Sequence, residues 1–261
     1  MGKNISYYVV DAFTGERFHG NPAGVCVLDE PLDAALMQRI AAENNLPETA
    51  FLLKRAGGYS LRWFTPKFEI DLCGHATLAA SFVVFNELEP ALQSVAFSTM
   101  SGMLTVARSG RFYEMSFPSR PARRIDLTAE QRLALGCAPE EVYAARDLLL
   151  VLRSESDVRE YVPDYDALQK PSGWLGVVVT APGREADFVS RYFCPELRAE
   201  DPVTGSAHCS LVPYWAERLG KDRLTAEQFS ERRGTLHCVL MGDRVRISGE
   251  AVLYLRGKLC I

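Results

Sequence analysis

Two segments that contain no Asp, Glu, Lys or Arg constrain most strongly how this chain can fold. They cover residues 74–85 and 205–215, and their first residues, Gly74 and Gly205, lie 205 minus 74, or 131, positions apart in a chain of 261. A helix that is apolar all round is normally buried in a core. Both segments open with Gly-x-Ala after a short acidic stretch, so a spacing of half the chain predicts an internal duplication. The alternative is coincidence, because two apolar helices are common in a chain of this length.

The duplication implies a fold of the α+β class with two pseudo-symmetric halves. Each half is expected to wrap a mostly antiparallel sheet around its central buried helix. The prolines at 118 and 121 indicate a linker, so we expect an N-terminal half over residues 1–118 and a C-terminal half over residues 119–250. Residues 251–261 could complete the first half, since a strand that returns to a sheet covers its bare edge.

Apolar periodicity and capping residues predict the remaining elements. A helix is expected at residues 33–44, with Asp33 as its cap, and another at residues 128–136. Pro213 is expected to kink the second uncharged helix or to limit its first segment. The predicted strands are at residues 7–13, 25–28, 50–54, 59–64, 95–98, 103–108, 111–117, 147–152, 174–180, 235–241, 244–248 and 251–256.

Composition and charge exclude several classes of protein. The chain is 48% hydrophobic and 24% charged, which is typical of a globular protein. With a net charge of −4 and no basic patch, it lacks the character of a nucleic-acid-binding protein. No stretch reaches the roughly 18 apolar residues that a membrane helix needs. The apolar run at Val9 and Val10 is too short for a signal peptide, so we expect a cytoplasmic location.

The spacing of cysteine and histidine does not indicate a metal site. The seven cysteines are scattered and form no C-x-x-C pair, and the four histidines show no ligand spacing. The motifs of dinucleotide-binding proteins, phosphate loops, serine hydrolases and zinc proteases are also missing. We therefore expect no metal and no cofactor, and most cysteines should be small buried side chains.

The starts of the two uncharged helices are candidate binding sites for an anion. The first N–H groups of a helix lack partners within it, and the helix dipole adds partial positive charge there. Two such ends facing one cleft would bind a substrate carboxylate. Gly74 and Gly205 would let the backbone approach the ligand closely, with Ala76 and Ser206 beside them. The alternative is that each glycine only permits a turn into its helix.

Glu48 is the most informative single residue. It lies between a predicted helix and an apolar strand, with Leu46 and Phe51 on either side. Partial removal of its carboxyl group from water would raise the pKa towards the range that is useful for proton transfer. The alternative is an ordinary solvated glutamate in a loop.

Three further candidates lie beside the helix starts. His75 is expected to be neutral there, so that it donates a hydrogen bond without carrying a charge. Asp201 could hydrogen-bond a substrate, or it could cap the second helix. Cys73 could be a reactive thiolate, because a helix N-terminus lowers a thiol pKa, or it could be an inert buried side chain. No cysteine occupies the matching place in the second half, at residues 202–205, so the thiol pair of a two-cysteine racemase is missing.

Six blocks of sequence carry a resemblance that covers essentially the whole chain. They are residues 11–13, 18–25, 46–51, 64–66, 69–79 and 200–208, and the last of them, EDPVTGSAH, is the most specific. In this order they resemble the PhzF-like family of phenazine-biosynthesis proteins, within the diaminopimelate-epimerase-like superfamily.

The resemblance implies a fold, an assembly and a set of site residues. The fold is that of diaminopimelate epimerase, the proteins are generally homodimers, and the active site lies in the cleft between the halves. Glu48 would act as the general acid/base that moves a proton between carbons of a small carboxylic acid, without a cofactor. His75 and Asp201 would assist it. The implied substrate-binding residues are Asn21, Gly74, Ala76, Gly205 and Ser206.

Two departures from the family pattern concern the substrate. Pro47 stands where many members have serine, and residues 193–199 lack the usual Gly-Ile pair. The resemblance therefore does not imply phenazine synthesis. Three hypotheses are carried forward: an isomerase that uses Glu48, a racemase or epimerase that uses Cys73 with another partner, and a catalytically idle binding protein of the same fold.

Overall fold

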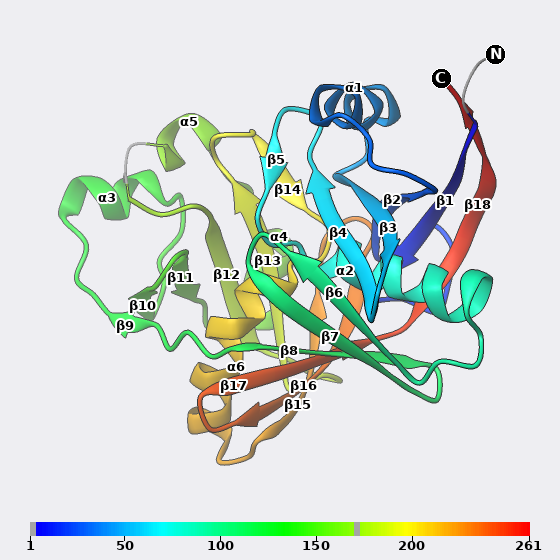
Figure 1. Ribbon diagram of the computed structural model, residues 1–261. Coiled ribbons are helices and arrows are strands. Elements are labelled where there is room, and N and C mark those ends of the chain that lie inside the picture. The colour runs from blue at the N-terminus through cyan, green and yellow to red at the C-terminus, as the bar shows by residue number, and fades with distance from the viewer. Residues whose placement is uncertain (1–3, 170–172) are drawn as a thin grey trace. The chain divides into compact units, whose positions relative to one another are not determined.

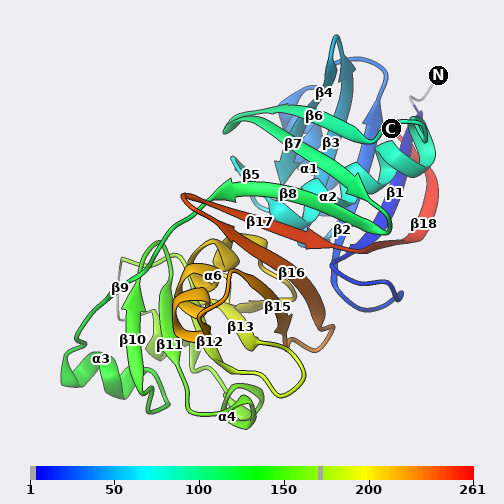
Figure 2. The same cartoon turned by 90° about the horizontal axis from the view of Figure 1, so that it is seen from below.

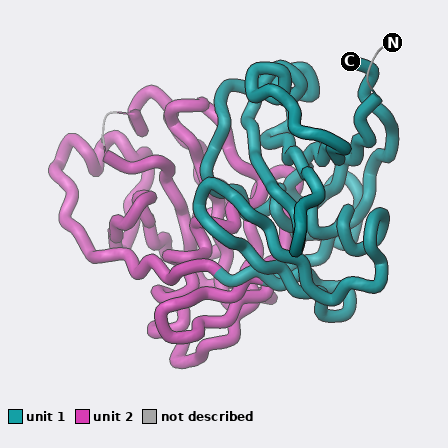
Figure 3. The backbone as a smooth tube through the Cα atoms, viewed as in Figure 1, with its two compact units in different colours: residues 1–116, 248–261 teal, residues 117–247 magenta. Residues whose placement is uncertain are grey.

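The chain folds into two compact units, each of which is described by itself. The computed structural model describes residues 4–169 and 173–261. Unit 1 joins the N-terminal part of the chain, up to Ser116, to its last segment, Ser248–Ile261, and unit 2 is Phe117–Ile247 (Figure 3). Each unit contains one central apolar helix and its own strands, as expected from the two uncharged segments.

Unit 1 surrounds its central helix with strands. The helices are α1 (Ala34–Asn44) and α2 (Gly74–Val83), and a π-helical segment, η1 (Val84–Leu88), continues α2. Its strands are β1 (Asn4–Ala12), β2 (Asn21–Leu28), β3 (Glu48–Arg55), β4 (Gly58–Phe64), β5 (Glu69–Ile70), β6 (Ser94–Thr99), β7 (Gly102–Ser109), β8 (Phe112–Pro118) and β18 (Ala251–Cys260).

The strand pairs of unit 1 are mostly antiparallel. β1 lies between β18 and β2 and is antiparallel to both, so the last strand of the chain pairs with the first (Figures 1 and 2). β2 is parallel to β3, which turns back into the antiparallel β4. β4 pairs with the short β5 and, in parallel, with β6, and β6 continues into the antiparallel β7.

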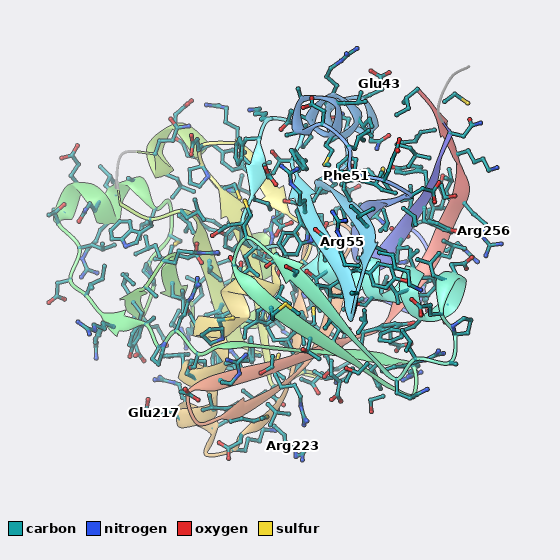
Figure 4. The ribbon with its side chains drawn as sticks, viewed as in Figure 1. Glu43, Phe51, Arg55, Glu217, Arg223 and Arg256 are labelled. Atoms are coloured by element: carbon teal, nitrogen blue, oxygen red, sulfur yellow. The ribbon has the colours of Figure 1, made fainter. Side chains whose placement is uncertain are left out.

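α2 is the buried centre of unit 1. It packs against β1, β2, β3 and β18, and Ala76, Leu78 and Ala80 are fully buried. Phe51 of β3 lies in the core, whereas Arg55 at the end of β3 is exposed (Figure 4). Because eight of the ten residues of α2 are buried, the absence of charge from this segment follows from its place in the fold. In the part of the chain that the structure describes, no helix is long and apolar enough to cross a membrane.

Unit 2 has the same kinds of elements. Its helices are α3 (Ala129–Ala134), α4 (Glu155–Glu160), α5 (Tyr165–Leu168) and α6 (Gly205–Leu219). Its strands are β9 (Arg123–Arg124), β10 (Glu141–Ala144), β11 (Leu148–Val151), β12 (Val177–Pro182), β13 (Phe188–Cys194), β14 (Ala199–Asp201), β15 (Arg223–Gln228), β16 (Gly234–Met241) and β17 (Arg244–Gly249).

The strand pairing of unit 2 repeats that of unit 1. β11 is parallel to β12 as β2 is to β3, and β12 turns back into β13 as β3 does into β4. β13 then pairs with a short strand, β14, and in parallel with β15, as β4 pairs with β5 and β6. In each unit the central helix follows the short strand directly. The expected fold of two pseudo-symmetric halves is confirmed.

A paired arginine and glutamate occur at the same place in both units. Arg62 of β4 donates two hydrogen bonds, of 2.6 and 2.7 Å, to the carboxylate of Glu69 on β5. Arg191 of β13 donates two, of 2.8 and 2.9 Å, to Glu200 on β14. A bidentate pair of this kind fixes geometry as well as adding energy. Each one holds the short strand that leads into the central helix.

Pro213 was expected to kink the second uncharged helix or to limit its first segment, and the second of these alternatives is wrong. α6 runs without interruption from Gly205 to Leu219, with Pro213 inside it. Proline has no N–H, so the carbonyl of Cys209, four residues earlier, loses its usual partner within the helix. The backbone N–H of Arg120 donates to that carbonyl at 2.9 Å. The segment at the start of unit 2 therefore satisfies the acceptor that proline leaves free.

Candidate active site

Glu48 is the first residue of β3. It pairs in parallel register with Ala23 of β2, and the residues that follow it, 49–53, are buried. Its side chain is only 16% exposed. The strand therefore holds the carboxyl group at a fixed place beside the core of unit 1, and the alternative of a solvated loop glutamate is wrong.

The start of α2 brings two more candidates to Glu48. Cys73 is the N-cap residue, in an extended conformation, and no side chain caps the helix. His75 lies in the first turn and is 5% exposed. Its Nε2 is 2.9 Å from Oε2 of Glu48, although the two atoms are not aligned as a hydrogen bond. Catalytic contacts are often misaligned before the substrate binds, so this pair remains able to tighten.

The other ring nitrogen of His75 faces a different pair of groups. Nδ1 lies 3.2 Å from Nδ2 of Asn21 and 3.6 Å from Sγ of Cys73. Asn21 is the first residue of β2 and is fully buried. Three of the predicted site residues of unit 1, namely Asn21, Glu48 and His75, therefore form one contiguous cluster with Cys73.

The surroundings of His75 favour its protonated form. Burial alone lowers the pKa of this ring, but Cys73 and Glu48 raise it by more, so that the pKa lies well above 6.5. Burial also raises the pKa of Cys73 above 9.0, so that its sulfur is an uncharged thiol at neutral pH. The negative charge next to the ring is then that of Glu48. The carboxylate at contact distance thus favours a charged ring over the expected neutral one, in opposition to burial and the helix terminus.

The same three residues have the donor types of a metal site, but their arrangement does not suit one ion. Ligand atoms of Glu48, Cys73 and His75 lie within 4.8 Å of one another. The carboxylate contacts Nε2 of the ring, whereas the sulfur contacts Nδ1. The two ring nitrogens point in divergent directions, so each of them is directed at only one of the other two ligands.

In unit 2 the start of α6 presents Ser206 to an arginine. Nη2 of Arg146 lies 2.9 Å from Oγ of Ser206. An arginine has donors only, so the serine oxygen must accept this bond and its own proton remains free to be donated. No side chain caps α6. Ser206 is thereby held as a hydrogen-bond donor at a helix end that already favours anions.

A buried carboxylate holds that arginine in place. Asp147 is 2% exposed and accepts bonds from Nε and Nη2 of Arg146. Tyr192 donates its hydroxyl proton to the same carboxylate at 2.8 Å. Burial raises the pKa of Tyr192, so the phenol keeps that proton at neutral pH. The sequence analysis did not single out Arg146, Asp147 or Tyr192. An Arg-Asp pair directly before an apolar strand was the available signal for the first two, and Tyr192 gave none.

Asp201 does not cap α6. It ends β14, and its Oδ2 accepts the hydroxyl of Thr204 at 2.5 Å. The buried Gln228 donates to the backbone carbonyl of Asp201 and accepts from the backbone N–H of Thr204. The loop between β14 and α6, which leads into Gly205, is thus fixed by side chains. Gln228 was not singled out in the sequence, because a lone glutamine on a strand gives no signal.

The strand registers align the two halves residue by residue. In unit 1, Phe64 of β4 pairs with Glu69 of β5 on one side and with Thr49 of β3 on the other. In unit 2, Phe193 of β13 pairs in the same way with Glu200 of β14 and with Val177 of β12. Thr49 and Val177 are therefore equivalent positions. The place of Glu48, one residue before Thr49, is therefore taken by Gly176. Counting from the first residues of the central helices, Thr204 replaces Cys73 and Ser206 replaces His75.

Gly176 leaves no room for a second acid/base group. A Cβ added there would lie 2.3 Å from the ring and from the hydroxyl oxygen of Tyr192. That is far inside any contact that real Cβ atoms make. The phenol that binds Asp147 thus fills the space that the side chain of Glu48 needs in the first half. The two halves share a scaffold and differ in chemistry.

A buried histidine in unit 2 predicts how stability depends on pH. His208 is fully buried, its Nδ1 lies 2.9 Å from the carbonyl of Thr204, and burial lowers its pKa to about 4. In the unfolded chain its pKa is about 6.5, so between pH 6.5 and 4 the unfolded state binds the extra proton. Stability from this group is therefore present above pH 6.5 and falls with decreasing pH. We expect a loss of about 2 kcal/mol between pH 7 and 5.

Urea unfolding of the His208→Gln variant tests this expectation. Glutamine can still donate to the carbonyl of Thr204 but does not titrate, so the variant should lose about 2 kcal/mol less than the wild type between pH 7 and 5. His19, whose side chain is 50% exposed, supplies the matched control His19→Gln, which should keep the wild-type pH dependence. Equal pH dependence in all three proteins would show that His208 is not the titrating group.

Comparison with known proteins agrees with this architecture. Residues 10–257 match the PhzC-PhzF family, described as phenazine biosynthesis-like protein. An uncharacterized isomerase of Pseudomonas aeruginosa is 49% identical over 259 residues, which are 98% of each chain. The crystal structure of a PhzF-family phenazine biosynthesis protein from Enterococcus faecalis is 48% identical and superposes with a TM-score of 0.96, covering 99% of this chain and 100% of that one.

A more distant neighbour shows the breadth of the fold. A hydroxyproline epimerase from Agrobacterium vitis superposes with a TM-score of 0.63 at 10% identity, over 99% of this chain and 93% of that chain. This likeness concerns the fold alone, and it agrees with the expected diaminopimelate-epimerase type of architecture. From the full-length family match and the close relatives it follows that the chain is an isomerase that belongs to the PhzC-PhzF family of phenazine biosynthesis-like proteins.

Proposed function

We propose that this protein is a cofactor-independent isomerase that moves a proton between two carbons of a small carboxylic acid. Glu48 removes the proton from an activated carbon and returns it to another carbon of the same molecule. One carboxyl group suffices for both steps if the substrate stays fixed and both carbons lie within its reach. A conjugated acid can delocalise the electron pair during the transfer, so the proposal invokes no metal.

The observation that carries the proposal is the one-sided distribution of acid/base groups. Glu48, His75 and Cys73 make one cluster in unit 1, whereas the equivalent positions in unit 2 hold Gly176, Ser206 and Thr204. A reaction that inverts a stereocentre through two opposed bases needs a proton donor and an acceptor from different sides. A single cluster supports transfer by one base.

The other site residues have supporting roles in this proposal. His75 lies beside Glu48 and can donate a hydrogen bond to charge that develops during the reaction. Asp201 binds a polar group of the substrate. Gly74 and Ala76 at the start of α2, and Gly205 and Ser206 at the start of α6, each offer donors to a carboxylate. The proposal also includes a cytoplasmic homodimer, which the family resemblance implies.

The racemase hypothesis has less support from the site. Cys73 is buried, and its raised pKa keeps it a thiol rather than a thiolate base. Thr204, at the equivalent position, has a hydroxyl that already donates to Asp201. The hypothesis of a catalytically idle binding protein does not explain why an imidazole and a carboxylate are buried next to each other. Burying two ionisable groups costs stability, and such a protein would gain nothing in return.

Isotope transfer tests the proposal directly. A panel of conjugated and cyclic carboxylic acids is incubated with the enzyme in deuterated water, and each product is examined by NMR. We expect deuterium at the one newly protonated carbon, or direct retention of a label from the substrate, because one carboxyl group carries the proton. We expect Cys73→Ser to retain most of the turnover. Deuterium at an inverted stereocentre, together with inactivity of Cys73→Ser, would establish the racemase instead.

A further inference from the structure

The two nitrogens of His75 face groups of different character. Nε2 lies beside the carboxylate of Glu48, and Nδ1 lies beside the amide of Asn21 and the thiol of Cys73. Asn21 is 0% exposed and begins a strand that pairs with β1 on one side and β3 on the other. The sheet therefore keeps the amide of Asn21 next to the ring, where it can turn about its own bond but cannot swing away.

The side-chain amide of Asn21 can hydrogen-bond to the ring of His75 whether that ring is neutral or charged. Nδ2 of the amide can donate to the lone pair of a neutral ring, and after a half-turn its oxygen can accept the Nδ1 proton of a charged ring. When the amide donates to Nδ1, the single proton of the neutral ring must be on Nε2. We propose that Asn21 is a positioning residue that keeps a proton on Nε2 of His75, beside Glu48, in both charge states of the ring.

The other groups around the ring cannot do this. Cys73 is an uncharged thiol and only a weak hydrogen-bonding partner. On β1, which also packs against α2, Asp11 is buried, and its Oδ2 accepts the backbone N–H of Phe18 at 2.9 Å. On β18, Arg256 is exposed and paired with Glu87. Glu48 remains as the charged group at the ring, and it faces Nε2.

The consequence is a fixed division of roles in the reaction, which rests on the proposed function. With a proton always on Nε2, His75 can donate to Glu48 or to the substrate but cannot accept a proton from either through this nitrogen. Glu48 is then the only group of the cluster that carries the substrate proton. His75 stabilises the carboxylate form of Glu48 and can release that stabilisation as the carboxyl group becomes protonated.

The tautomer of His75 can be measured without a substrate. In protein labelled with ¹⁵N-histidine, long-range proton–nitrogen NMR correlations distinguish the two neutral tautomers and the charged ring, and the variant His75→Gln assigns the signals. We expect the wild type to show the charged ring, and the Nε2-protonated form wherever the ring is neutral. A neutral ring protonated on Nδ1 would overturn the proposal, and this result does not depend on any variant of Asn21.

Two substitutions of Asn21 should change the pKa of His75 in opposite directions. Asn21→Asp places an acceptor of the same shape at Nδ1 and should raise the pKa by about one unit, or tenfold in proton affinity. Asn21→Leu removes the acceptor and should lower it by about as much. Asn4→Asp, the same change at an exposed site of unit 1, should leave it unaltered. Shifts of the same sign in both variants, as general loosening would give, contradict the proposal.

These readouts separate the inference from the proposed function. The tautomer and the pKa of His75 are observed in the resting enzyme, so they are informative whether or not the reaction is the proposed one. If Glu48→Gln were fully active while Asn21 behaved as expected, the proposed function would fail and the positioning role would stand. If the tautomer were wrong while Glu48→Gln was inactive, only the positioning role would fail.

Discussion

Replacing Glu48 with glutamine is expected to lower turnover by about 10² to 10⁴, while substrate binding survives. Glutamine keeps the shape of the side chain but cannot accept a proton. The side chain is mostly buried at the start of β3, and His75 stands beside it. A water molecule is a poor substitute base in this position, because it is neither fixed nor as basic as a carboxylate.

A metabolite screen measures this effect before the substrate is known. Wild type and Glu48→Gln are incubated with small carboxylic acids in deuterated water, and mass spectrometry identifies compounds that gain deuterium only with the wild type. Glu43, an exposed residue of α1 in the same unit, provides the matched control Glu43→Gln, which should be fully active (Figure 4). Undiminished labelling with Glu48→Gln would refute Glu48 as the acid/base.

Removing the buried carboxylate of Asp147 is expected to have the largest effect on stability. Asp147→Ala leaves Arg146 without its bidentate partner and leaves the hydroxyl of the buried Tyr192 without an acceptor. Breaking a buried ion pair by removing one partner typically costs about 3 to 5 kcal/mol. We expect a loss of this size in the free energy of unfolding, measured by urea denaturation at pH 7.

An exposed aspartate separates this effect from a general loss of charge. Asp126, in the same unit, has a fully exposed side chain next to Arg132, at 3.9 Å. Because exposed ion pairs contribute about 0 to 1 kcal/mol, Asp126→Ala should change stability by no more than that. If the two variants were equally stable, the Arg146–Asp147 pair would have no structural role, and the orientation of Ser206 would need another explanation.

The central helices could be predicted from the sequence because burial on every side leaves a clear pattern. A helix with no exposed face cannot carry an unpaired charge, and both uncharged segments begin where expected, at Gly74 and Gly205. The cap of α1 was also predictable, since Asp33 accepts the N–H groups of Ala35 and Leu36. These features depend on local chemistry alone.

Elements that depend on distant partners could not be predicted in this way. β13 contains a charged Arg191 among apolar residues, and its partner, Glu200, lies nine residues further along the chain. β15 pairs in parallel with β13 across α6, and although its residues alternate between more exposed and buried, only Leu224 and Ala226 of the buried ones are apolar. The continuation of α6 through Pro213 depends on Arg120, which lies far away in the sequence.

The site shows the same limit. Family motifs indicated Glu48, His75 and Asp201, and the structure places the first two in contact within unit 1 and the third at the end of β14, before α6. The sequence indicated a neutral His75, because the carboxylate that favours the charged ring belongs to Glu48, 27 residues away in the chain. Arg146 and Tyr192 carry no motif, and their importance follows only from the contacts that they make. The cleft between the halves stays a prediction.

The arginine–glutamate pairs at equivalent places in the two units have a consequence for how enzymes of this fold diversify. Both halves hold the strand that enters the central helix with such a pair, Arg62–Glu69 or Arg191–Glu200, whereas the place of Glu48 is taken by Gly176 in the second half. On the proposed mechanism the second half carries no substrate proton. Substitutions there can therefore change substrate contacts while the proton carrier of the first half stays the same.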